Sequence, residues 1–135
     1  MSTEALLAII GGALFLLGLV TVLTRRPKKL DRAQYQSKWN DLQALCKHQE
    51  TWPLAVINAD KLLDDALKRL HFKGKTMGER LVSAQRTLTD NDGAWFGHKL
   101  RNKLVHEENV KISERDVKDA LIGIRQALRD LGALK

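Results

Sequence analysis

Hydrophobic and polar positions follow two different patterns, one on each side of residue 30. From Ala5 to Leu23 no residue is charged, and the segment consists of Ala, Leu, Ile, Gly, Phe, Val and one threonine. After Leu30, apolar residues recur at spacings of three and four, which is typical of amphipathic helices, and no stretch alternates like a strand. The sequence therefore predicts an all-α protein with one N-terminal transmembrane helix and a compact bundle of about five helices.

The first segment has the length of a membrane span. As a helix, the 19 residues Ala5–Leu23 would be about 28 Å long, close to the hydrocarbon thickness of a bilayer. A secretory signal peptide is the competing interpretation. It is disfavoured because Glu4 rather than a basic residue precedes the segment, and because no small-residue cleavage pattern follows it. A buried helix of a soluble protein is a poorer alternative, since the segment is apolar on all sides.

A basic cluster follows this segment and consists of Arg25, Arg26, Lys28 and Lys29. Basic residues that flank a membrane helix stay in the cytoplasm, so we expect a single-pass protein of the inner or plasma membrane with its N-terminus outside. The cluster can also hold the C-terminal domain near anionic lipid headgroups. The expected organisation is a transmembrane anchor at 1–24, a basic juxtamembrane linker at 25–29 and a cytoplasmic helical domain at 30–135.

Capping signals divide the helical domain into five predicted helices. They begin near Asp31, Thr51, Thr76, Ala94 and Ser113. Two of these starts have an acidic residue three positions later, as in a capping box, and another is followed by a proline in the first turn. The second helix is expected to run to about Leu70 and to be ended by Gly74, residues 89–93 to form a turn, and the fourth helix to reach at least Val105.

Charge and cysteine content add little to this picture. The net charge is +7, and residues 30–135 carry 19 basic and 15 acidic side chains, a net charge of +4. A mildly basic domain neither requires nor excludes a nucleic-acid partner. Cys46 is the single cysteine, which rules out an internal disulfide, and its position beside Leu42 and Leu45 predicts a buried thiol that packs as a small apolar group.

The fourth predicted helix carries the polar residues that are best suited to catalysis or ligand binding. His98, Asn102 and His106 are four residues apart and share one helix face. Arg101 and His106 are five apart, which places them about 140° apart on a straight helix. The two side chains can converge only if the helix ends near Val105 or if a second subunit completes the site.

The segment Arg101-Asn102-x-x-x-His106 resembles the signature of the HEPN superfamily, in which an arginine, usually followed by a polar residue, precedes a histidine on a helix of a small bundle. Many HEPN proteins are metal-independent endoribonucleases that act as dimers. The resemblance implies a homodimer with RNA as substrate, His106 as general acid/base, Arg101 stabilising the phosphorane and Asn102 orienting the phosphate or the histidine. The implied products are a 2′,3′-cyclic phosphate and a 5′-hydroxyl, and the implied role is a stress or defence effector.

Two alternatives stay open at this point. Arg101, Asn102 and His106 could form a polar network that fixes a helix end and a dimer contact, in a non-catalytic domain that brings a protein partner to the membrane. His98, Asn102 and His106 would make a poor metal site, since no acidic cluster completes it. No cofactor is expected, because the chain has no phosphate-binding glycine loop, nucleophile elbow or Cys/His zinc pattern.

Overall fold

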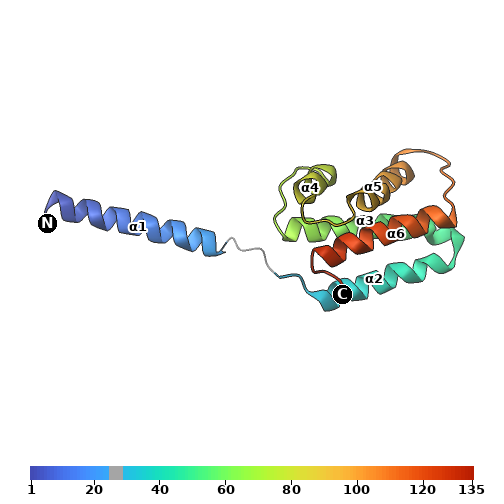
Figure 1. Ribbon diagram of the computed structural model, residues 1–135, viewed down its shortest axis with the longest axis horizontal. Helices are drawn as coiled ribbons and strands as arrows, with labels where there is room; N and C mark the ends of the chain where they lie inside the picture. The colour runs from blue at the N-terminus through green and yellow to red at the C-terminus, as the bar shows by residue number, and fades with distance from the viewer. Residues whose placement is uncertain (25–28) are drawn as a thin grey trace.

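The computed structural model describes residues 1–24 and 29–135. Within these ranges every regular element is a helix, and no strand occurs (Figure 1). The helices are α1 (Thr3–Thr24), α2 (Arg32–Ala44), α3 (Trp52–Arg69), α4 (Met77–Ala84), α5 (Asn91–His106) and α6 (Glu114–Asp130). Two short 3₁₀ turns, Leu45–Lys47 and Gln49–Thr51, join α2 to α3. The predicted fold class and the number of bundle helices are confirmed.

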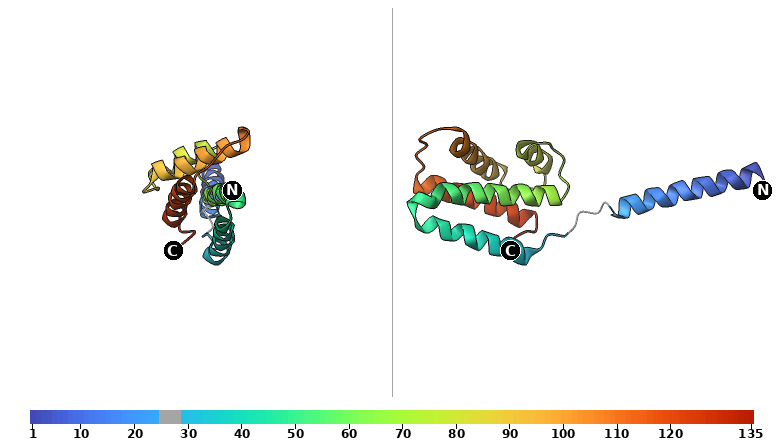
Figure 2. Two further views of the ribbon diagram at one scale, coloured as in Figure 1. Left: turned by 90° about the vertical axis from the view of Figure 1, so that its right-hand side faces the viewer. Right: turned by 180° about the vertical axis from the view of Figure 1, so that it is seen from behind.

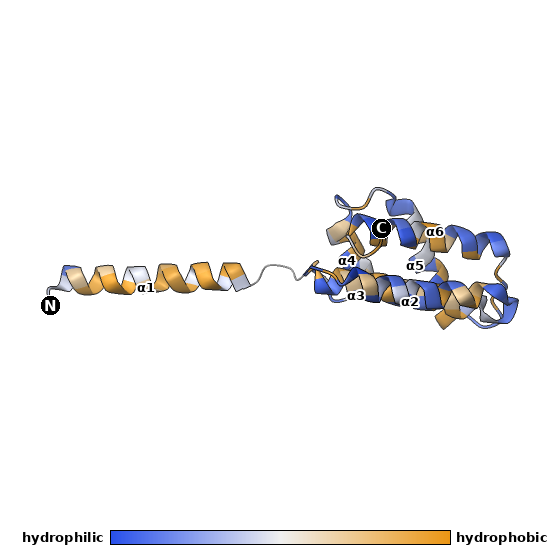
Figure 3. Ribbon diagram, turned by 90° about the horizontal axis from the view of Figure 1, so that it is seen from below, coloured by the Kyte–Doolittle hydropathy of each residue, from blue (hydrophilic) through white to orange (hydrophobic). Residues whose placement is uncertain are grey.

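Helix α1 is separate from the bundle and buries none of its residues in the protein. It is long and apolar enough to cross a membrane. In Figure 3 most residues of this helix have hydrophobic colours, in contrast to the mixed hydrophobic and hydrophilic colours of α2–α6. Three residues of the basic cluster, Arg25, Arg26 and Lys28, lie outside the described residues.

Helices α2 to α6 enclose one main core: α3 and α6 lie side by side, α4 and α5 cover one side of this pair, and α2 lies on the other side, antiparallel to α3 (Figure 2). Burying an aliphatic side chain contributes about 1.5–3 kcal/mol. A smaller apolar cluster of Val56, Leu100, Val117 and Ala120 continues the core between α3, α5 and α6. The largest fully buried side chains of the domain are Trp39, Leu63, Leu67, Leu81, Ile124, Leu128 and Val56.

Helices α5 and α6 approach each other closely because glycines line their contact. A Cβ atom on Gly123 would overlap the backbone of Gly93, and one on Gly97 would lie 2.7 Å from Cδ1 of Ile124. Such contacts require a neighbouring atom to move, so the positions need the absence of a side chain. This packing fixes α5, the helix that carries the candidate motif, against the core.

The predicted caps at Asp31, Thr76 and Ser113 are confirmed. Asp31 accepts a hydrogen bond from the backbone N–H of Gln34, and Thr76 and Ser113 form complete capping boxes. Thr51 precedes α3 as predicted, but its side chain makes no capping bond to that helix.

One predicted helix start and one predicted helix-terminating residue were wrong. Helix α5 begins at Asn91, three residues before the predicted start, because the Asp90 carboxylate accepts from the N–H of Gly93 and caps the helix there. Helix α3 ends at Arg69, close to the predicted end near Leu70, but Gly74 is not the residue that ends it: His71 adopts φ 60°, and the N–H of Phe72 donates to the carbonyl of Leu67 at 3.1 Å. This is a Schellman motif in which histidine takes the place usually held by glycine.

Candidate functional site

The candidate site is built where α5 crosses α3 above a buried carboxylate. Asp60 of α3 has a relative exposure of 3%. Nδ1 of His98 lies 3.1 Å from Asp60 Oδ1, and Nε of Arg101 lies 3.8 Å from Asp60 Oδ2. Asn102 completes the group, since its Nδ2 lies 3.4 Å from Nε2 of His98. We call Asp60, His98, Arg101 and Asn102 the Asp60 cluster.

The hydrogen bonds of the cluster assign the proton on His98. A guanidinium N–H of Arg101 donates to Oδ1 of Asn102 at 3.0 Å, which directs the amide nitrogen of Asn102 toward His98. Nε2 of His98 must then act as an acceptor, while Nδ1–H donates to the Asp60 carboxylate. These contacts fit a ring that donates from Nδ1 to the buried Asp60 carboxylate and accepts at Nε2 from the Asn102 amide. A ligand that displaces the Asn102 amide would meet the Nε2 lone pair, which can accept a proton from it.

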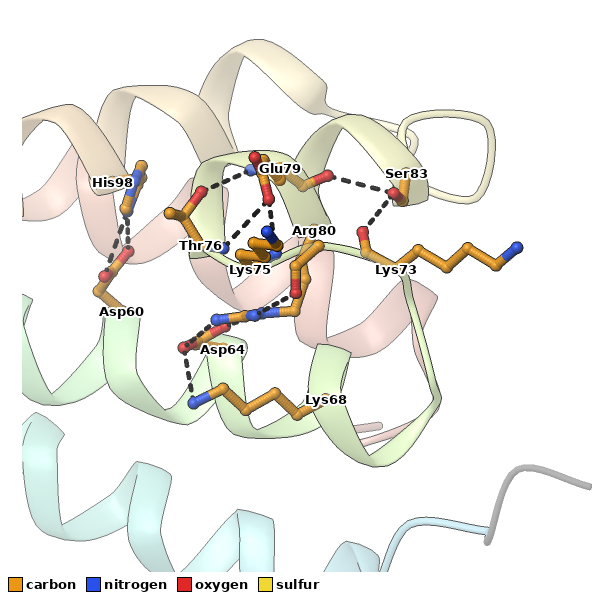
Figure 4. A network of polar contacts seen from close by, with 11 residues as sticks. Asp60, Asp64, Lys68, Lys73, Lys75, Thr76, Glu79, Arg80, Ser83 and His98 are labelled. Carbon is orange, nitrogen blue, oxygen red and sulfur yellow. Dashed lines mark hydrogen bonds and ion pairs between the residues drawn. The ribbon is translucent and has the colours of Figure 1, made fainter. Parts of the chain in front are cut away.

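The Asp60 cluster faces a cleft of about 710 Å³. The start of α4 forms one wall of the cleft through Thr76, Met77 and Gly78. The Arg101 side chain is 34% exposed, so its guanidinium is available to a ligand although it also contacts Asp60. Figure 4 shows the His98–Asp60 contact between α5 and α3, beside the start of α4. The cleft therefore combines a fixed cation with a histidine acceptor.

His106 lies outside this group. It is the last residue of α5, is exposed, and does not line the cleft. It follows His98 by eight residues, which corresponds to about 12 Å along a helix. Helix α5 ends at His106, one residue beyond Val105, so Arg101 and His106 both have helical backbone and stay about 140° apart around the helix axis. Only the second of the two conditions, a site completed by another subunit, is left for this motif.

A second polar network lies beside the cleft and fixes α4 to α3. Buried Arg80 donates to Asp64 from Nε at 2.7 Å and from Nη2 at 3.1 Å, and to the carbonyl of Gly74 at 2.9 Å (Figure 4). Burial raises the pKa of Asp64, but the hydrogen bonds and charges of Arg80 and Lys68 outweigh it and hold this pKa below the usual value. The network positions the start of α4 at the rim of the cleft.

Cys46 and Trp52 pack in the smaller apolar cluster and do not line the cleft. The thiol of Cys46 is half-buried rather than fully buried, lies against the smaller apolar cluster, and has a pKa raised by burial. Trp52 packs in the same cluster and donates from Nε1 to the carbonyl of Cys46 at 2.9 Å. In residues 1–24 and 29–135, no three histidine, cysteine or acidic side chains gather as metal ligands would.

Sequence reasoning found Arg101 and Asn102 as neighbours in a polar site and placed His98 on the same face as Asn102. It gave His98 only a weak metal role and missed Asp60. The signal for Asp60 was present, because this acid falls at helical spacing among the buried positions Val56, Leu63 and Leu67. A charged residue on such a face is expected to have a partner, but its partner lies 38 residues away on another helix.

The chain matches no family model, no curated protein and no solved structure. The resemblance to the HEPN superfamily therefore rests on residues 101–106 and on their place near the end of a bundle helix.

Proposed function

We propose that this chain is a membrane-anchored, metal-independent endoribonuclease, with the Asp60 cluster at the cytoplasmic face of the inner or plasma membrane. The observation that supports the proposal most is the combination, in one open cleft, of the partly exposed Arg101 side chain and the His98 ring held by buried Asp60. A guanidinium suits a phosphate through its fork of donors, and an imidazole suits proton transfer near neutral pH.

The proposed reaction uses the RNA 2′-hydroxyl as nucleophile. The RNA displaces the Asn102 amide from Nε2 of His98, and Nε2 then accepts the hydroxyl proton while the 2′-oxygen attacks the adjacent phosphorus and the bond from phosphorus to the 5′-oxygen breaks. Arg101 stabilises the negative charge on the phosphorane, and Asn102 holds the phosphate. The departing 5′-oxygen takes a proton from an acid, so the products are a 2′,3′-cyclic phosphate and a 5′-hydroxyl. Asp60 is a positioning residue, since it acts through His98.

His106 enters this scheme as the acid, supplied by a second copy of the chain. Within one subunit His106 is exposed and distant from the cleft, whereas a two-fold interface can bring the partner subunit's His106 to it. The proposal therefore includes a homodimer. Mixing Arg101→Ala subunits with His106→Ala subunits should restore part of the cleavage, because some mixed dimers then hold one intact composite site.

The test is cleavage of total RNA by wild type and single variants. His98→Ala, Arg101→Ala and His106→Ala should each lower the cleavage rate by about 10²–10⁴-fold, with nearly unchanged helicity and no sensitivity to chelators. Lys103→Ala is the matched control: this exposed residue of the same helix should weaken RNA binding mildly and in a salt-dependent way. Equal cleavage by all variants would refute the proposed roles.

The second candidate function is a non-catalytic module that brings a protein partner to the membrane. It is favoured because Arg101 and Asn102 already bond to residues of the same chain, as expected of side chains that hold α5 against α3. Exposed Phe96 and Ile122, at 40% and 55%, offer apolar contacts outside the cleft. In this case Arg101→Ala would lower the unfolding temperature strongly, and the wild type would not cleave RNA.

A further inference from the structure

Basic side chains gather at the end of the bundle where the chain from α1 enters. Four segments meet at this end: residues 29–32, 68–73, 85–90 and 129–135. Nε of Arg32 donates to the carbonyl of Gly132 at 3.1 Å, and the N–H of Thr89 donates to Asp130 at 2.8 Å. The hydroxyl of Ser83 donates to the carbonyl of Lys73. Figures 1 and 4 show the start of α2, the end of α6 and the α3–α4 connection on this side.

The two ends of the bundle differ in charge. The four segments at the entry end carry eight basic and three acidic side chains. At the opposite end, residues 45–52 and 106–116 carry three basic and five acidic side chains. These two distal segments lie together, since Cys46, Trp52 and Ile112 pack in one apolar cluster. The domain is therefore polarised along its long axis, with the positive end toward α1.

The acids at the entry end are already occupied as hydrogen-bond acceptors. Asp31 and Asp90 cap α2 and α5, and Asp130 accepts from Thr89 and Gln126. Two of the basic residues, Lys68 and Arg69, pair with acids of α3. Six exposed cations of the entry end make no ion pair with any residue in 1–24 and 29–135. We call these six the basic end: Lys29, Arg32, Lys73, Arg86, Arg129 and Lys135.

The chain keeps the basic end close to the membrane surface. Only residues 25–29 separate the end of α1 at Thr24 from Leu30, the first buried residue of the bundle. Even when fully extended, such a connection spans no more than about 20 Å. The headgroup layer occupies roughly 5–8 Å of this distance, and the Debye length is about 8–10 Å near physiological salt. The basic end is thus held where the field of an anionic leaflet acts on it.

We propose that the basic end is a docking surface for anionic lipid headgroups, which orients the bundle with the entry end on the membrane and its acidic end away from it. The inference rests on the proposed anchoring by α1 and goes beyond it, since a tether alone would leave the orientation of the domain undefined. The bundle is expected to dock more tightly on leaflets that contain phosphatidylserine than on purely zwitterionic ones.

The test measures the acylation rate of individual lysines in the full chain reconstituted in nanodiscs. In nanodiscs containing phosphatidylserine, Lys73 and Lys135 should react severalfold more slowly than in nanodiscs of phosphatidylcholine alone. Exposed Lys111 and Lys118, near the distal end, should react at equal rates in both. High salt should remove the difference, because the attraction is screened.

Two double variants that remove positive charges provide an independent test. Lys73→Gln with Arg129→Gln should weaken the protection of Lys135, whereas Lys111→Gln with Lys118→Gln should leave it unchanged. Equal rates for Lys73 in both lipids, with the protein incorporated, would overturn docking while leaving the anchor intact. Failure of the chain to enter nanodiscs would overturn both. Protection by added RNA in phosphatidylcholine nanodiscs, in place of protection by phosphatidylserine, would assign the surface to nucleic acid and refute lipid docking.

Discussion

The carboxylate of Asp60 determines how the side chains of His98 and Arg101 on α5 are oriented. An ionised acid buried to this extent is stable only when charged or polar groups surround it. His98 and Arg101 both approach its carboxylate, at 3.1 and 3.8 Å. The same carboxylate thereby fixes the ring orientation of His98 and draws Arg101 toward the cleft wall. The proposed chemistry depends on this arrangement more than on the spacing of the sequence motif.

Arg80 and Asp64 provide a test of stability that is independent of function. Arg80→Met should lower the free energy of unfolding by about 2–3 kcal/mol, because it leaves a half-buried carboxylate with only the exposed Lys68 as partner. Urea denaturation followed by circular dichroism measures this loss. Exposed Arg115, in a loose i,i+4 pair with Asp119, is the control, and Arg115→Met should cost no more than about 0.5 kcal/mol.

The same pair predicts a pH dependence. Since the folded-state pKa of Asp64 is lowered from 3.8, its ionised form contributes stability that is complete above the unfolded-state value and is lost as the pH falls through the folded-state value. The stability difference between wild type and Asp64→Asn should therefore be constant near neutral pH and shrink in acid below about pH 4. A difference that grows on acidification would contradict this assignment.

The contact between α5 and α6 holds the candidate site in place and depends on glycines, which have no side chain. Gly123→Ala should destabilise the domain by about 1–3 kcal/mol, because the new methyl group would overlap the backbone of Gly93 and force the helices apart. Gly78→Ala is the matched control, since a Cβ there meets its nearest atom, in Trp95, at 3.5 Å. Thermal unfolding of both variants checks the prediction, and equal melting temperatures would contradict the packing argument.

Local signals predicted most of the helices, and contacts between helices explain what they missed. The caps at Asp31, Thr76 and Ser113 are decided by residues within one turn, so the sequence was sufficient to place them. Gly93 was assigned to a turn, yet it lies inside α5. The Asp90 cap that begins this helix is a local signal that the sequence analysis missed, whereas the packing of α6 against Gly93 is a contact that no local pattern supplies.

The candidate site was predictable to the same extent. Helical spacing was enough to place His98 and Asn102 on one face, but the predicted site grouped Arg101 and Asn102 with His106 and not with His98. The partner of His98 was not predictable, because Asp60 reaches it only through the packing of α3 on α5. The distance of His106 from the cleft follows from the length of α5, whose last residue it is.

For the protein as a single unit, the membrane anchor is the first property to test. The full chain should resist carbonate extraction, whereas a truncated form of residues 30–135 should be soluble, because the bundle core includes no residue of α1. A reporter fused to the C-terminus should be active in the cytoplasm. Recovery of the full chain in the soluble fraction, or cleavage near Thr24, would contradict a transmembrane anchor.

The most direct test of the proposed chemistry is the structure of the RNA ends. The full chain, reconstituted in nanodiscs and incubated with a defined RNA oligonucleotide in the presence of a chelator, should yield fragments ending in a 2′,3′-cyclic phosphate and fragments beginning with a 5′-hydroxyl. The same oligonucleotide with 2′-O-methyl groups should stay intact, because the nucleophile is blocked. Mass spectrometry of the fragments decides the result. An intact RNA, cleavage of the methylated strand, or loss of cleavage on chelation would contradict the account.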